Sequence, residues 1–229
     1  MSTILAIDTA SAQIALALAV DGQIIESSVV SGGHDHSRLL LPAIASVLGE
    51  RRNSLSGIAV VRGPGNYAGL RVGIATAKGL AIAHAVRIRG ISTMEAVTRA
   101  LDHPTATVAV TVIHPVGRNE FAVQEFRGVD ASGPIFALPA DQLSGSSLVG
   151  EGAEALGGTD VSPEQRVRAA LRALIEAFGA PGETPPVDAI YLREPNITVP
   201  RRPLNARAVE QTHQPEEPAL GTNPHSCKA

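Results

Sequence analysis

The hydrophobic pattern of the first hundred residues alternates between the periods of strands and helices. Short apolar runs at 3–8 and 57–63 predict buried strands. Two further apolar runs meet at Asp21 and Gly22, and they predict a β-hairpin because both turn residues tolerate a positive φ. Apolar residues with the helical period predict a helix over 37–48. The alternation continues to about residue 100 and indicates an α/β fold.

Serine residues stand where three predicted helices begin. Ser37 is placed to cap the first helix, and Ser92 with Glu95 has the spacing of a capping box. Ser162 precedes the helix that the sequence predicts most clearly, over 163–179.

A second series of strands begins near His103 and suggests a second α/β unit. We therefore predict an N-terminal lobe over 1–102 and a smaller C-terminal lobe over 103–199. Residues 200–229 are polar and rich in proline, which predicts a disordered tail.

Small residues recur every fourth position in the segment 63–85, GPGNYAGLRVGIATAKGLAIAHA. It is not a phosphate-binding P-loop, because Lys78 comes two turns into the predicted helix, and no dinucleotide fingerprint is present. Such a stripe lets another backbone approach closely. The pattern leaves open whether that backbone belongs to this chain's own sheet or to a partner helix.

Composition and charge narrow the class of protein. The chain is 44% hydrophobic with a formal net charge of −3, which indicates a globular protein and argues against nucleic-acid binding by bulk electrostatics. Its single cysteine, Cys227, excludes a disulfide framework. No apolar run is long enough to span a bilayer and no basic leader precedes the first strand, so we expect a cytoplasmic protein without membrane contact.

Candidate chemistry is sparse. Asp8, Thr9 and Ser11 follow the first strand, where actin-like ATPases hold a phosphate and a metal-bound water, although strand-end aspartates commonly cap turns. His34 and His36 offer two metal ligands without an obvious third, and their glycine neighbours predict a solvated loop. The sequence contains no nucleophile elbow and no zinc-protease motif. From chemistry alone it indicates no catalyst.

Five segments occur in an order that resembles the bacterial TsaB (YeaZ) family: ILAIDTA, HSRLLLPAI, GPGNYAGLRVGIATAKGLA, GISTMEAV and YLREP. Together they cover residues 3–195. The resemblance implies a two-lobed, actin-like α/β fold (the ASKHA class of sugar kinases and Hsp70) with a reduced second lobe. It also implies a role in making threonylcarbamoyladenosine at position 37 of tRNA.

The same resemblance implies a subunit without its own catalysis. In the catalytic homologue TsaD, two histidines hold a metal where Thr93 and Val97 stand here, while Glu95 is retained. His114 and Pro115 replace the Asp-Ala that usually opens the second lobe. We therefore expect no metal, no cofactor and weak or absent nucleotide binding.

Partners follow from the resemblance too. They are a TsaD-like catalytic subunit, a TsaE-like ATPase and, through the complex, tRNA, and a second copy of the chain is expected to use the same docking face. In this family the first two long helices dock the partner. The expected interface residues are Leu39, Leu40, Leu41, Ile44, Gly69, Leu70, Gly73, Ile74, Ala77 and Ala81.

Three alternatives stay open at this point. The first is an actin-like ATPase or small-molecule kinase that uses Asp8. The second is a metallopeptidase of the M22 type. The third is a homodimeric protein with a role outside tRNA modification.

Overall fold

The structure is a computed structural model that describes residues 2–101, 109–179 and 187–192. Residues 1–193 group into one compact unit, and 194–229 form a separate unit that lies outside the described residues. The predicted boundary between two lobes at residue 102 and the predicted tail also lie outside them. The division into lobes therefore stays a prediction.

The first sheet is mixed and has the strand order β3-β2-β1-β4-β5. Strands β3, β2 and β1 pair antiparallel, while β4 and β5 continue the sheet parallel to β1. The predicted hairpin is confirmed, since Asp21 and Gly22 join β2 to β3 with φ angles of 47° and 81°. The strands are β1 Thr3–Asp8, β2 Gln13–Val20, β3 Gln23–Ser31, β4 Leu55–Val61 and β5 Arg87–Ile91.

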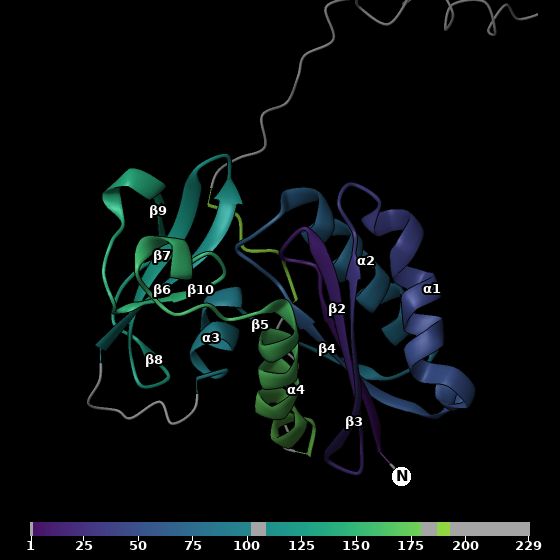
Figure 1. The fold of residues 1–229 in the computed structure, drawn as a ribbon. Helices are drawn as coiled ribbons and strands as arrows, with labels where there is room; N and C mark the ends of the chain where they lie inside the picture. Colours follow the sequence, from purple (N-terminus) through teal and green to yellow (C-terminus); the bar gives the residue numbers. More distant parts are fainter. Residues whose placement is uncertain (1, 102–108, 180–186, 193–229) are drawn as a thin grey trace, which may run out of the picture. The chain divides into compact units, whose positions relative to one another are not determined.

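Helices cover both faces of the first sheet (Figure 1), with α1 (His36–Leu48) and α2 (Tyr67–Ala83) on one face and α4 (Pro163–Gly179) on the other. Successive side chains of strand β2 point to opposite faces of the sheet, and the two faces carry side chains of different size. Leucine and isoleucine side chains point toward α1 and α2, while alanines point toward α4. The small alanine side chains allow α4 to lie close to the strands.

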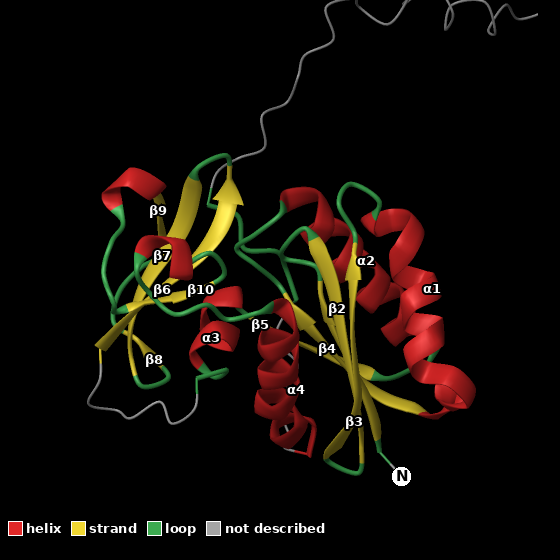
Figure 2. Ribbon diagram, viewed as in Figure 1, coloured by secondary structure: helices red, strands yellow, loops and turns green. Residues whose placement is uncertain are grey.

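The second sheet has the strand order β10-β6-β7-β8 (Figure 2), and β9 pairs with the first half of β7 on the same edge as β8, opposite β6. The short helix α3 (Thr93–Thr98) packs on this sheet. The strands are β6 Ala109–Gly117, β7 Glu120–Arg127, β8 Asp130–Ala131, β9 Phe136–Pro139 and β10 Leu148–Gly150, and 3-10 helices occupy Gly49–Ser54, Ala140–Gln142 and Glu154–Leu156.

Two of the three predicted serine caps are confirmed. Ser92 Oγ accepts a hydrogen bond from the N–H of Glu95, and Ser162 Oγ accepts one from the N–H of Gln165. The prediction for Ser37 is wrong, because α1 begins at His36 and Asp35 precedes it.

Helix α4 carries a charged residue in its buried stripe. Arg166 lies beside Val167, and both side chains are inaccessible to solvent. Ala169, Ala170 and Leu171, about one turn later, are buried as well. A guanidinium in such a stripe requires partners inside the protein. Among the described residues, no helix is long and apolar enough to cross a membrane.

Candidate functional site

A buried ion pair joins the end of β1 to α4. Arg166 Nε donates to Asp8 Oδ2 at 2.6 Å, and the two side chains are fully buried. The second carboxylate oxygen, Oδ1, accepts a hydrogen bond from the backbone N–H of Ala10 at 2.9 Å. Both oxygens of the strand-end aspartate therefore have partners within the chain.

The Arg166 guanidinium also contacts residues of the second sheet. Its NH1 group donates to Glu151 Oε2 at 2.9 Å and lies 3.5 Å from Nδ1 of His114 on β6. Burial alone lowers the pKa of Arg166, but the carboxylates of Asp8 and Glu151 outweigh that effect and raise the pKa. Arg166 is therefore a permanent cation that connects β1, β6 and the residue after β10.

His114 is the neutral member of this network. Its Nε2 atom lies 3.1 Å from the carbonyl oxygen of Ala10, which only accepts hydrogen bonds, so Nε2 carries the proton. Nδ1 is then the unprotonated nitrogen that faces Arg166. Burial, reinforced by the charge of Arg166, lowers the pKa of His114 to about 3.

These residues do not fit a magnesium-bound nucleotide. A metal-bound water at Asp8 requires access to its carboxylate, but this side chain is inaccessible to solvent and lies between Arg166 and the backbone N–H of Ala10. Thr9 is buried with its side chain against Gly73, and Ser11 Oγ exchanges hydrogen bonds with the backbone of Gln13. The three candidates from the sequence therefore form a closed turn rather than a phosphate cradle.

The glycine-rich segment 63–85 packs against that same turn. A Cβ atom on Gly65 would overlap the carbonyl oxygen of Ala10, and one on Gly69 or Gly73 would overlap the carbonyl oxygen or the hydroxyl of Thr9. The N–H of Asn66 donates to Ala10 O at 2.6 Å. Of the two interpretations that the sequence left open, close packing within the chain accounts for these three glycines.

The ten expected interface residues fall into two groups. Leu39 is half-buried and Leu41 is 54% exposed. The other eight are largely buried in the chain's own core, although the edge of Ile74 reaches a groove beside α2. They are Leu40, Ile44, Gly69, Leu70, Gly73, Ile74, Ala77 and Ala81.

The outer face of α2 carries different residues, which sequence reasoning missed. Arg71, Ala75, Lys78 and Ile82 are exposed and follow one another at helical spacing. Ile82 is 81% exposed, the highest value among the large apolar side chains of the described residues. Their signal was present in the sequence. The helical periodicity that puts the small residues on one stripe of α2 puts these four residues on the opposite stripe.

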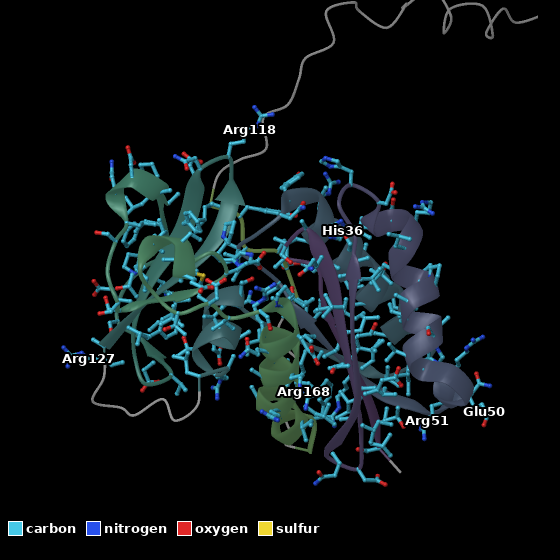
Figure 3. All side chains as sticks on the ribbon, in the orientation of Figure 1. His36, Glu50, Arg51, Arg118, Arg127 and Arg168 are labelled. Atoms are coloured by element: carbon cyan, nitrogen blue, oxygen red, sulfur yellow. The ribbon has the colours of Figure 1, made fainter. Side chains whose placement is uncertain are left out.

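The structure also shows where His34 and His36 lie, and where the residues at the positions of the TsaD metal ligands lie. Figure 3 shows His36 at the start of α1, where its Nε2 lies 3.1 Å from the carbonyl oxygen of Ser11. The expectation of a solvated loop is therefore wrong for His36, which is buried, and holds for His34, which is exposed. Thr93 and Val97 are both inaccessible to solvent. No cluster of three His, Cys, Asp or Glu side chains that could hold a metal occurs within the described ranges.

Comparison with known proteins identifies the family. The model of the TsaD family (tRNA N6-adenosine threonylcarbamoyltransferase) matches residues 24–143. The chain belongs to the TsaD-related family that includes TsaB (YeaZ). Among relatives, it is 35% identical over 96 residues to the tRNA threonylcarbamoyladenosine biosynthesis protein TsaB of Bacillus subtilis. It is 34% identical over 94 residues to that of Escherichia coli.

The two matches to TsaB cover 41% and 40% of this chain, and they span only 42% and 40% of the two relatives. Among solved structures, YeaZ from Pseudomonas aeruginosa aligns with a TM-score of 0.65 at 22% identity, over 84% of this TsaB-related chain and 100% of that one. This likeness confirms the predicted actin-like α/β fold.

Proposed function

We propose that this chain is a non-catalytic subunit of a complex that makes N6-threonylcarbamoyladenosine at position 37 of tRNA. In this proposal it docks a TsaD-like catalytic subunit, holds it in a competent arrangement and helps to form the binding site for a TsaE-like ATPase. The tRNA contacts the chain only through the complex. A second copy of the chain uses the same face when the catalytic subunit is absent.

The observation that carries the proposal is the Asp8–Arg166 ion pair. It occupies the strand-end carboxylate that an actin-like ATPase needs for its metal-bound water. A buried guanidinium at this point also repels a divalent cation. A relative of TsaD with this position closed is better suited to a structural role than to phosphoryl chemistry.

The outer faces of α1 and α2 support the docking part of the proposal. Leu41 on α1 and Ile82 on α2 are 54% and 81% exposed. Besides its charged residues, the outer stripe of α2 carries the small Ala75 and Gly79, which let a second helix approach. We define the docking face as the exposed residues Leu41, Arg71, Ala75, Lys78, Gly79 and Ile82.

Reconstitution tests the proposal. A TsaD-like subunit, a TsaE-like ATPase, a threonylcarbamoyl-AMP synthase, tRNA, ATP and threonine are combined with and without the chain, and modified tRNA is quantified. We expect modification to require the chain and to fail with Ile82→Asp or Leu41→Asp. Phe136→Asp, at a residue that is 44% exposed on β9 of the second sheet, is the matched control and leaves modification unchanged.

Two results would count against the proposal. Equal modification without the chain would exclude a required subunit, and equal loss of activity in the Phe136 control would exclude a specific docking face. Unfolding curves of each variant separate a lost interface from a lost fold.

A further inference from the structure

A groove runs along the docking face, between α2 and the segment that follows α4. It has a volume of about 370 Å³. Arg71, Ala75 and Lys78 form one wall together with Ile74, and the opposite wall comes from Asp188, Ala189 and Tyr191. The apolar surface in the groove comes from Ile74, Ala75 and Ala189.

Two tyrosines meet beside this groove, and they are the only tyrosines of the chain. The rings of Tyr67, at the start of α2, and Tyr191 have centroids 4.8 Å apart and are tilted by 44°. Arg71 lies against the Tyr67 ring, 5.4 Å from its centroid, and donates to the Tyr67 hydroxyl at 3.1 Å. Tyr191 itself is 40% exposed. Tyrosine and arginine in such a cluster are the residue types that dominate binding energy at protein interfaces.

The charges of the groove favour an acidic occupant. Arg71 and Lys78 contribute two positive charges, whereas Asp188 contributes one negative charge. Lys78 Nζ lies 3.2 Å from Asp188 Oδ1, and both side chains are largely exposed, so this pair is weak and easily exchanged for another carboxylate. Arg71 donates to the Tyr67 hydroxyl and not to a carboxylate. The groove therefore carries one cation that no carboxylate of its lining neutralises.

We propose that this groove binds an acidic, aliphatic segment of the protein partner, with carboxylates at Arg71 and Lys78 and an aliphatic side chain over Ile74 and Ala75. The inference rests on the proposed function, because the occupant is a segment of the docked catalytic subunit. Tyr191 covers the aliphatic side chain and excludes water from the ion pairs. Exclusion of water strengthens those pairs.

Nucleic acid is the less suitable occupant. Asp188 would face a phosphate, and the apolar surface of the groove offers a phosphodiester no hydrogen bond. The net charge of −3 adds a further electrostatic cost for RNA. Binding of RNA is instead one outcome of the test.

The experiment measures the affinity of the full chain for a purified TsaD-like subunit, at low and at high salt. Arg71→Glu is compared with Arg127→Glu, a matched charge reversal at an exposed residue of β7 in the second sheet. We expect Arg71→Glu to weaken binding about tenfold or more and Arg127→Glu to leave it unchanged. A blocked Glu-Leu-Glu-Leu-Glu peptide should compete for the groove, and a Lys-Leu-Lys-Leu-Lys peptide should not.

Each other outcome has one meaning. Tight partner binding that Ile82→Asp abolishes and Arg71→Glu leaves intact overturns the acidic groove while the docking face survives. No partner binding by the wild type overturns the proposed function and the groove together. Binding of an anticodon stem-loop RNA by the chain alone, lost in Tyr191→Ala, overturns the inference in favour of nucleic acid.

Discussion

Arg166 on α4 and Asp8 on β1 lie 158 positions apart in the chain and meet in a fully buried ion pair with an Nε–Oδ2 distance of 2.6 Å. Glu151 and His114 lie against the NH1 group of the same guanidinium, while its NH2 group is buried without a hydrogen-bond partner among the described residues. Because Glu151 and His114 belong to the second sheet region and Asp8 to the first sheet, Arg166 connects the two sheets within the residue 1–193 unit.

Arg166→Met should destabilise the protein by about 3–5 kcal/mol, because it leaves the Asp8 and Glu151 carboxylates without their cation. Arg172→Met, on an exposed face of the same helix, should cost far less and serves as the control. Urea unfolding of both variants measures the difference. In the double variant Asp8→Asn with Arg166→Met, the loss should be smaller than the sum of the single losses, and a strictly additive result would contradict the direct pairing.

The stability of the fold should fall as the pH falls from about 6.5 toward about 3, partly because of His114. Its pKa is lowered to about 3 in the folded protein, so the unfolded chain binds a proton at a higher pH than the folded chain does. The stabilising effect of the neutral imidazole is complete above the unfolded pKa and is lost as the pH decreases through this window, with a slope of about 1.4 kcal/mol per pH unit. His114→Gln removes this titration.

The test for His114 compares the free energy of unfolding of the wild type and His114→Gln at several pH values between 7 and 4. Acidic groups titrate in both proteins, so their effect cancels in the difference. We expect the difference between the two proteins to shrink with decreasing pH. A difference that stays constant over this range would show that His114 does not titrate as its burial requires.

Gly73 and Gly79, both in α2, should respond in opposite directions to the same substitution. Gly73→Ala places a Cβ atom against the Thr9 side chain and should destabilise the protein. A Cβ atom at Gly79 meets nothing within 4 Å, so Gly79→Ala should stabilise the helix by up to about 1 kcal/mol. The measurement is the midpoint of thermal unfolding of each variant, compared with that of the wild type. Equal effects would contradict the close approach of the turn after β1 to α2.

MgATP should bind weakly or not at all to the isolated chain, with a dissociation constant above about 1 mM. The reason is that Arg166 and the Ala10 N–H already occupy the Asp8 carboxylate. Isothermal titration of wild type and Asp8→Ala provides the measurement. Tight binding that disappears in Asp8→Ala would favour the ATPase or kinase alternative over a docking subunit.

Local features of the fold were readable from the sequence. The turn at Asp21 and Gly22 and the helix from Pro163 depend on neighbouring residues, and both appear where the pattern predicts them. Arg166 was missed although its signal is present, since it stands in the apolar stripe of α4. Asp8 was identified as a strand-end aspartate, but its pairing with Arg166, and that of Glu151, could not be predicted because both depend on the packing of distant elements.

The small residues of α2 show a second limit of sequence reasoning. Gly69 and Gly73 indicate that another backbone approaches α2 closely, but they do not identify it. A turn of the same chain and a helix of a partner would both need glycine at these positions. The structure assigns that approach to Thr9 and Ala10. The residues left for a partner, such as Ile82, are identified by their exposure rather than by their pattern.

The carbonyl oxygen of Ala10 accepts two hydrogen bonds, one from the N–H of Asn66 at the start of α2 and one from Nε2 of His114 on β6. One buried carbonyl oxygen therefore holds the turn after β1 to the start of α2 and to β6 of the second sheet at the same time.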